Sequence, residues 1–200
     1  MKKILTLLPL LSIFSLGVFA QQAFQAGLWV GPVSSQISGD GLGGWDKFGL
    51  AGGAWIRSEF GEKWSATAGM QFIQKGSRTK RDTLNFQTFA YSLGYIEVPV
   101  MAGYRIKDWQ INLGGFAGFL ISQKIIANGI ETDPNPPFES IEVGATGGAT
   151  YFLGEKWAIE LRGSSSILPV RPSPNFANSL SYYERGNTNQ VIQLMIHLRF

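Results

Sequence analysis

The sequence predicts an all-β protein, an eight-stranded antiparallel up-and-down transmembrane β-barrel. Three observations lead to this prediction. Apolar residues recur at every second position in eight segments, long and short connections alternate between them, and aromatic residues mark the segment ends at the short connections. Of 200 residues, 25 are glycine, 13% are aromatic and only 16% are charged. This composition excludes a disordered or highly solvated chain.

The start of the chain has the pattern of an export signal. Lys2 and Lys3 form a short basic region, residues 4–18 are apolar, and small residues precede the expected cleavage point after Ala20. We therefore predict a signal peptide at residues 1–20. An uncleaved N-terminal anchor is the alternative, but the apolar stretch is short for a membrane span.

The remaining residues, 21–200, form the predicted outer-membrane β-barrel domain. Without Lys2 and Lys3, the 17 basic residues become 15 against 14 acidic ones, which leaves a net charge of +1. A basic surface suited to nucleic acid is therefore not expected. The absence of cysteine excludes disulfides, thiolate metal sites and a lipidated cysteine anchor. Because the chain has a single histidine, His197, a multi-histidine metal site is excluded too, and we expect no cofactor.

The predicted strands follow one another along this domain, and on one face of each strand every residue is apolar or glycine. The first predicted strand starts at Phe24, soon after the cleavage point, and the third, fifth and seventh start at a tryptophan that follows a short turn. The last one runs to Phe200. In chain order, the eight predicted strands cover residues 24–30, 48–56, 64–72, 96–104, 109–121, 141–153, 157–161 and 192–200.

The connections between these strands differ in length in a regular way. Three are short, at residues 60–64, 106–109 and 153–157, and each contains charged residues beside an aromatic or aliphatic one. The other four are long and polar, at about 32–44, 77–88, 123–139 and 168–189. Strict alternation of long and short connections is typical of up-and-down strands with one trimmed end and one exposed end.

Alternation alone does not decide which face points outward, because a soluble ligand-binding barrel would place its apolar face inside. Aromatic side chains at the short turns favour an apolar face that meets lipid, since such rings sit at headgroup level. The predicted export signal also favours an apolar face that meets lipid, and in lipid a closed barrel is the form in which strands can satisfy their backbone hydrogen bonds. The expected periplasmic aromatic girdle comprises Phe60, Trp64, Tyr104, Trp109, Tyr151, Trp157 and Phe200.

The opposite face combines glycines with ionisable residues and is expected to form a lumen charge network. Glu97 is the most informative member, because a carboxylate inside a narrow barrel is costly unless it is paired. Arg57, Arg105 and Arg162 are its candidate partners, and Pro99 two positions later predicts a local bulge or an irregular hydrogen bond. The expected network contains Arg57, Lys75, Glu97, Arg105, Glu142, Glu160, Arg162, His197 and Arg199.

Two short motifs resemble a known family. Residues 95–100, Tyr-Ile-Glu-Val-Pro-Val, followed by Gly103 and Tyr104, are similar to the "YLEIPLLLKY" segment of the PorT-like outer-membrane β-barrel family. Residues 74–77, Gln-Lys-Gly-Ser, resemble its "QKG" strand end. The resemblance implies a small outer-membrane barrel. One founding member is linked to a secretion and gliding apparatus, a role that we do not carry over to this chain.

Four functions remain open at this stage. The first is a plugged barrel with a structural or partner-docking role, because eight strands leave an interior just wide enough for side chains. A narrow small-solute channel is the second, and a soluble periplasmic barrel that binds an apolar ligand is another. A lipid-modifying enzyme would need His197 with Ser164 or Ser166 and Glu160 to meet lipid, whereas His197 alternates with lipid-facing residues. We therefore expect no enzymatic activity.

The expected partners follow from the predicted location. Outer-membrane lipid and lipopolysaccharide would surround the apolar face. Arg78, Lys80 and Arg81 on the second long loop would either meet lipopolysaccharide phosphates or form a merely solvated loop tip. The C-terminal strand that ends at Phe200 would engage the barrel-assembly machinery. A further envelope protein partner is expected without a stated identity, and nucleic acid is not expected as a partner.

Overall fold

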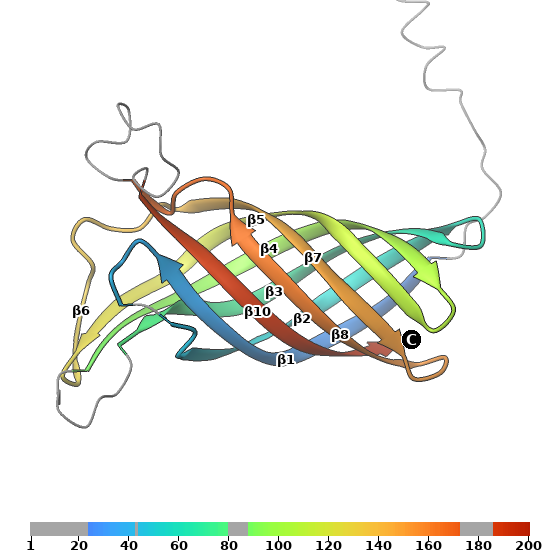
Figure 1. Cartoon of the computed structure of the whole chain (residues 1–200), viewed down its shortest axis with the longest axis horizontal. Helices are drawn as coiled ribbons and strands as arrows, with labels where there is room; N and C mark the ends of the chain where they lie inside the picture. The colour runs from blue at the N-terminus through green and yellow to red at the C-terminus, as the bar shows by residue number, and fades with distance from the viewer. Residues whose placement is uncertain (1–23, 43, 80–87, 173–185) are drawn as a thin grey trace, which may run out of the picture.

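The computed structural model describes residues 24–42, 44–79, 88–172 and 186–200 (Figure 1). The predicted signal peptide at residues 1–20 lies outside these residues, as do Lys80 and Arg81. The described strands are β1 (Gln25–Ser38), β2 (Lys47–Phe60), β3 (Trp64–Arg78), β4 (Phe89–Ile106), β5 (Trp109–Ala127), β6 (Ile130–Thr132), β7 (Ile141–Phe152), β8 (Trp157–Ser166), β9 (Arg171–Pro172) and β10 (Gly186–Arg199).

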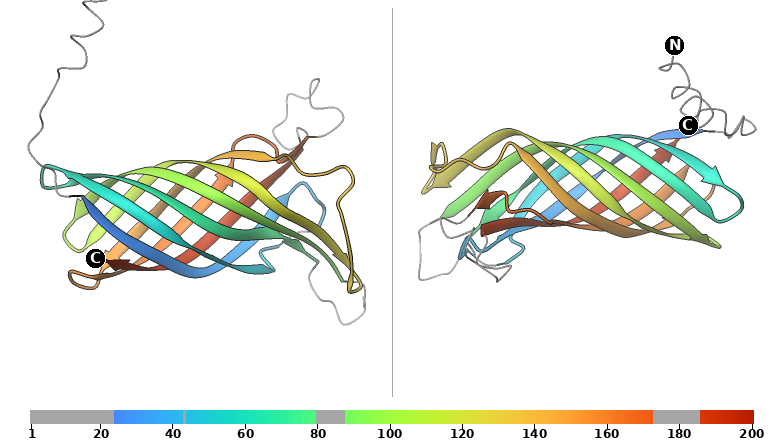
Figure 2. Two further views of the ribbon diagram at one scale, coloured as in Figure 1. Left: turned by 180° about the vertical axis from the view of Figure 1, so that it is seen from behind. Right: turned by 90° about the horizontal axis from the view of Figure 1, so that it is seen from above.

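Eight long strands form a closed antiparallel barrel. Each pairs with the next in the order β1-β2-β3-β4-β5-β7-β8-β10, and β10 pairs back with β1, from Gly27↔Arg199 to Ser38↔Thr188. The two short strands extend this sheet at one end, where β6 pairs with β5 and β9 with β10. Figures 1 and 2 show the strands tilted around the long axis. The predicted fold class is confirmed.

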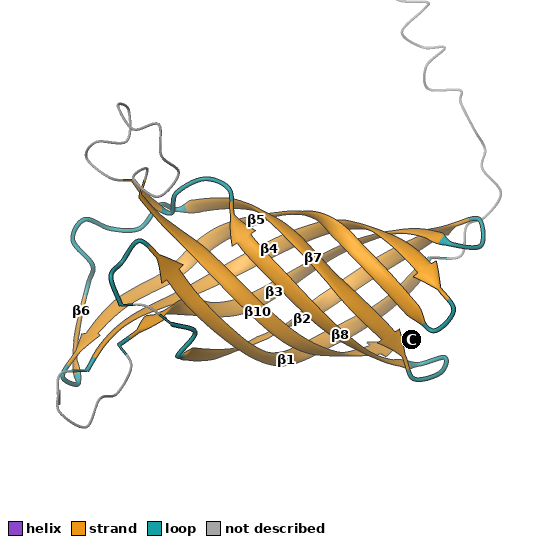
Figure 3. Cartoon of the chain, viewed as in Figure 1, coloured by secondary structure: helices purple, strands orange, loops and turns teal. Residues whose placement is uncertain are grey.

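The strand and loop colouring in Figure 3 shows a described structure built of strands and their connections. Three short turns lie at one end, which we call the short-turn end, and the longer connections lie at the other, the long-loop end. In the described ranges, no helix is long and apolar enough to cross a membrane.

The apolar face points outward, as predicted. Phe48 and Leu113 expose 73% and 71% of their surface, and other large residues of the predicted apolar faces, such as Leu50 and Ile196, are exposed as well. A soluble barrel with an apolar ligand pocket requires the opposite orientation, so this alternative is wrong for the structure. An outward apolar band needs lipid around it.

Several strands continue beyond their predicted ends. The first was expected to stop at residue 30, but β1 runs to Ser38, and β4 begins at Phe89 rather than at residue 96. In the added part of β1 the pattern is reversed: Val33 and Ile37 are buried inside while Ser34 and Gln36 face outward. The predicted strand ended where the outward apolar pattern ends, although β1 itself continues to Ser38.

The bulge of β4 lies near Glu97 but not at Pro99. Ala68 pairs with Val100 and Gln71 with Glu97, so the β3–β4 register is unchanged across the proline. The register shift of β4 against β5 occurs instead between Gly94 and Tyr95. The bulge thus lies toward the long-loop end. At the proline itself, the β3–β4 ladder leaves residues 98–99 unpaired, which is the irregular hydrogen bonding expected of a residue without an N–H donor.

The predicted girdle residues gather at the short-turn end. Their order around the barrel follows from the registers Phe60↔Trp64, Trp64↔Tyr104, Trp109↔Tyr151 and Leu198↔Trp157. The Trp64 and Tyr104 ring centroids are 4.8 Å apart, and those of Trp109 and Tyr151 are 4.9 Å apart. Phe200 is exposed at the same end. Contact of these rings with lipid headgroups stays a prediction.

Candidate functional site in the barrel lumen

Side chains fill the lumen, and part of the filling is apolar. Only polar residues and glycines were predicted on the inner face, so this apolar cluster was missed. Consecutive apolar residues such as Leu28-Trp29-Val30 and Ala54-Trp55-Ile56 are the signal, because they make both faces of a strand apolar. The buried cluster contains Trp29, Val33, Ile37, Ala51, Trp55, Ile73, Leu93, Tyr95, Phe138, Val170, Val191 and Met195.

Inward glycines accommodate the large rings of this filling. A Cβ on Gly69 would overlap the Trp29 ring, and one on Gly27 would lie 2.5 Å from a ring atom of Trp55. Gly144, which pairs with Phe116, is covered by the Phe116 ring in the same way. The glycines thus leave room for particular rings, and the lumen contains packed aromatic side chains.

Lys75 is the centre of a first ion cluster, in which every member is buried. Its Nζ pairs with Glu97 and lies 3.0 Å from Oε2 of Glu142. Gln71 donates to Glu97 (2.9 Å), and Asn189 donates to Oε2 of Glu142 (3.0 Å). The Lys75 ammonium also lies 4.7 Å from the centroid of the Phe116 ring. One buried cation thus bridges carboxylates on β4 and β7.

Glu160 is the centre of a second buried ion cluster. Its Oε2 accepts from Nη2 of Arg162 (2.6 Å) and lies 2.9 Å from Nε2 of His197. Nδ2 of Asn112 donates to the other carboxylate oxygen at 3.1 Å. The Arg162 guanidinium lies 4.4 Å from the centroid of the Trp29 ring. Together these contacts link β5, β8, β10 and β1 across the interior.

The predicted partners of Glu97 were wrong. Lys75 pairs with it, whereas Arg162 binds Glu160 and Nε of Arg57 donates to Thr67 (3.1 Å). Six of the nine predicted network residues thus form the two buried clusters. The other three, Arg57, Arg105 and Arg199, lie together near the short-turn end.

Loop residues close the long-loop end of the lumen, within the described residues. Phe138 and Val170 pack into the apolar cluster and are 5% and 0% exposed. A hydrogen bond of 2.8 Å from the Glu139 N–H to the Val170 carbonyl joins the two loops. The Arg171 guanidinium lies over the Phe138 ring, 5.5 Å from its centroid. These residues form an apolar cap above the ion clusters.

On the β5–β6 hairpin, beside its first paired residues, Lys124 pairs with Glu131. The hydrogen bond and the charge of Glu131 raise the pKa of Lys124, which is exposed. This pair provides an exposed counterpart to the buried pairs of Lys75.

The arrangement offers little to catalysis or metal binding. His197 faces Glu160, and the Ser166 hydroxyl donates to Glu142 (2.7 Å). The Ser164 hydroxyl has no hydrogen-bond partner among the described residues. Ser164 and His197 are therefore not hydrogen-bonded to each other. Among the residues that the structure describes, no group of three or more His, Cys, Asp or Glu side chains is placed to hold a metal ion.

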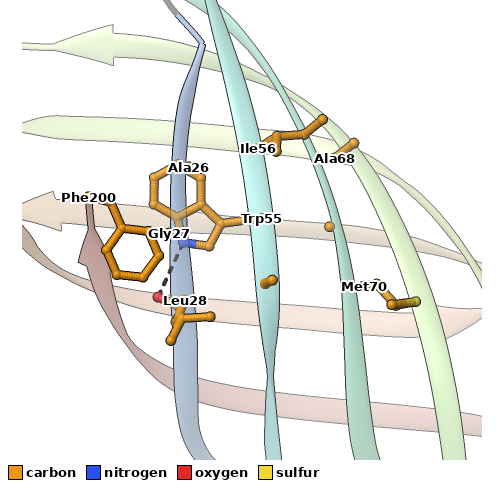
Figure 4. Close-up of a pocket in the computed structure, with 10 residues that line it drawn as sticks. Ala26, Gly27, Leu28, Trp55, Ile56, Ala68, Met70 and Phe200 are labelled. Atoms are coloured by element: carbon orange, nitrogen blue, oxygen red, sulfur yellow. Dashed lines mark hydrogen bonds between the residues drawn. The ribbon is translucent and has the colours of Figure 1, made fainter.

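A shallow groove of about 370 Å³ lies on the outer face near the short-turn end (Figure 4). Small residues of β1, β2 and β3 leave the space between larger neighbours. Trp55 lines the same groove, and its indole N–H donates to the Leu28 carbonyl at 3.2 Å. The lining is apolar throughout and includes Ala26, Leu28, Ala54, Ile56, Ala68, Met70 and Phe200.

Comparison with known proteins gives a family and a fold. The family described as "Outer membrane protein beta-barrel domain" matches residues 19–170. Ail of Yersinia pestis, the attachment invasion locus protein, is 15% identical with a TM-score of 0.50, over 88% of this chain and 99% of that one. Neisserial surface protein A is 9% identical with a TM-score of 0.50, over 88% and 97%. The search of curated proteins found no match.

Proposed function

We propose that this chain, which belongs to the outer membrane protein beta-barrel domain family, is a plugged outer-membrane barrel with a structural or partner-docking role. The observation that supports this function most directly is the filled lumen. Two ion clusters and an apolar cap occupy the interior of the described barrel. The parts left for function are then the loops, the two rims and the lipid-facing wall.

Opening a path through this lumen is energetically costly. A solute that separates Lys75 from its carboxylates leaves buried charges without partners, and such a loss costs roughly 3–5 kcal/mol. The Glu160 cluster imposes a second penalty of the same kind. A lumen that stands open without a stimulus is therefore disfavoured. The competing proposal is a narrow channel for small solutes. A catalytic role finds no support in the contacts of His197.

The proposed partners follow from the surfaces. Outer-membrane lipid covers the apolar wall, and Arg78, the described member of the basic loop cluster, meets lipopolysaccharide phosphates. The C-terminal strand β10 engages the barrel-assembly machinery, and a further envelope protein docks on a rim. We also propose that residues 1–20 act as a cleaved signal peptide, and that the chain is a PorT-like member of its family.

Planar-bilayer recording of the mature protein tests the plugged lumen. We expect no conductance steps above those of bilayers that receive detergent alone. The matched variant carries Lys75→Gly, Glu97→Gly and Glu142→Gly, which removes the first cluster, and a gel shift between boiled and unboiled samples checks that each protein is folded. Reproducible steps from the wild-type protein would overturn the plugged barrel and establish the channel.

A second test addresses the docking role in native membranes. Photo-crosslinking groups are placed at Ile130 in β6 at the long-loop end, at Lys63 in the turn between β2 and β3, and at Leu113 on the lipid-facing side of β5. A single protein partner that crosslinks from one rim position and not from Leu113 supports docking. Crosslinks to lipid alone from all three positions would limit the role to a structural one.

A further inference from the structure

Three arginines gather at the short-turn end, outside both ion clusters. They come from β2, β4 and β10 and surround Phe152, the last residue of β7. The guanidinium carbon of Arg57 lies 5.6 Å from the centroid of this ring, and that of Arg105 lies 4.3 Å from it. Arg199 lines a small cavity of about 20 Å³ together with Arg57 and Phe152.

None of these three guanidinium groups forms an ion pair within the described part of the chain. Arg57 is only 4% exposed, yet its hydrogen bond goes to the neutral hydroxyl of Thr67. Nε of Arg105 donates to the backbone carbonyl of Lys107 at 3.2 Å. Arg199 is half-buried, and its backbone N–H donates to the carbonyl of Lys156.

Several carboxylates lie near this group, but among the described residues none of them forms an ion pair with it. Glu160 attracts Arg57, but its two oxygens are already held by Arg162, His197 and Asn112. Glu59 also attracts Arg57, but it accepts a hydrogen bond from Gln25 (2.9 Å). Glu59 and Glu62 line a second small cavity with Arg105. Glu155 lines the cavity, and within the described ranges it forms no salt bridge with an arginine.

Like charges at this spacing repel one another. Because Arg57 and Arg105 lie against one ring, their guanidinium carbons are within about 10 Å, near the screening length at physiological salt. Burial of Arg57 strengthens the repulsion, since a low dielectric screens charge less than water does. An anion between the groups would remove this cost. Arginine is also the side chain whose planar fork matches phosphate and carboxylate oxygens.

We propose that the three arginines at the short-turn end bind one oxyanion, a phosphate or carboxylate group. Arg57 lies at the base of this site, and Arg105 and Arg199 lie at its rim. The cavity beside Arg57 has room for about one water-sized group. One oxygen of the ligand therefore enters it, while the rest of the group stays at the rim. The site faces the periplasm, a placement that rests on the proposed outer-membrane location and on the periplasmic position predicted for the aromatic girdle at the same end.

The test uses the mature protein in nanodiscs of zwitterionic lipid, with inorganic phosphate and acetate as probes at constant ionic strength. The NMR signals of the Trp55 indole N–H and the arginine Nε–H groups report on the site, because Trp55 lines the same cavity. We expect saturable shifts. Arg105→Gln and Arg199→Gln should each weaken binding roughly tenfold, since each removes a charged hydrogen-bond donor.

Arg171→Gln is the matched control, because Arg171 also lies over a phenylalanine ring but at the opposite end of the barrel. Its probe affinity should equal that of the wild-type protein. Shifts that rise linearly with probe concentration, or that persist in the Arg105→Gln/Arg199→Gln double variant, would overturn the site.

A second arm identifies the source of the oxyanion. Discs with phosphatidylglycerol and no added probe present lipid phosphate, and saturation there before any probe is added assigns the site to a headgroup. Unchanged signals in those discs, with saturation by dissolved phosphate, assign it to a soluble ligand. Both arms use a folded barrel, verified by its gel shift on boiling, so their outcome is independent of the conductance and crosslinking tests.

Discussion

Replacing Lys75 by methionine removes the cation that bridges two buried carboxylates. Met is close to Lys in length and can fill the space beside the Tyr95 and Phe116 rings, whose centroids lie 5.0 and 4.7 Å from the ammonium. The change therefore acts mainly on charge. Glu97 and Glu142 then remain buried, facing each other without a cation between them.

The size of the effect follows from burial. Loss of one partner of a buried ion pair typically costs about 3–5 kcal/mol, and here two carboxylates lose the same partner. Total folding stability of ordinary domains is about 5–15 kcal/mol, so K75M should remove a large part of it. Replacing the carboxylates as well, in K75M/E97Q/E142Q, removes the unpaired charges and should recover most of the loss.

Urea unfolding in lipid vesicles, followed by tryptophan fluorescence, measures both free energies of unfolding. Lys124→Met is the matched control, because Lys124 pairs with Glu131 in the same way but is 54% exposed. It should leave the urea midpoint unchanged, since exposed pairs contribute little. A loss below about 1 kcal/mol in K75M, or a triple variant no more stable than K75M, would refute the energetic role of the cluster.

Three further predictions concern packing and the membrane. Gly69→Ala places a Cβ 2.4 Å from a ring atom of Trp29 and should cost about 1–3 kcal/mol in the same unfolding assay. Gly163→Ala, with its nearest neighbours at 4.0 Å, should be neutral, and equal effects of the two changes would contradict the packing argument. Leu113→Arg on the outer face should cost about 2–4 kcal/mol in vesicles, and Ile130→Arg on β6 should cost little; a neutral L113R would argue against a lipid-facing wall. Phe138→Ala removes the ring of the apolar cap and should lower the free energy of unfolding by about 3 kcal/mol. Planar-bilayer recordings of this variant should show no conductance steps, because both ion clusters remain. New conductance steps would show that the cap alone closes the lumen.

Sequence alone was sufficient for the eight strands and for the direction of their faces. Lipid on one side of a wall imposes a period of two, and residues such as Leu113 and Ile159 carry this period directly in the sequence. The same criterion failed in the last part of β1. There Val33 and Ile37 point inward and Ser34 outward, because the strand has left the apolar band.

Pairing inside the lumen was beyond the sequence for a different reason. The alternating pattern shows that Lys75 and Glu142 point inward. It does not show where they lie along the barrel axis or around it. Both depend on the tilt and stagger of the strands. Lys75 on β3 reaches Glu142 on β7, which is not a neighbour in the sheet, and the two are 67 positions apart in the chain. Arg162 was assigned to Glu97, whereas its own strand provides Glu160, two residues earlier.

The two ion clusters also bear on how the barrel closes. Each joins strands that are not neighbours: Lys75 connects β3 with β7, and Asn112 on β5 binds Glu160 on β8. These contacts exist only when the sheet is rolled into a cylinder. An open sheet in the membrane would expose the same charged groups to lipid, where they are expensive. The clusters therefore penalise forms in which the barrel is not closed, and they disfavour a barrel opened between β1 and β10. Along this seam His197 of β10 pairs with Trp29 of β1, and His197 also contacts Glu160 of β8.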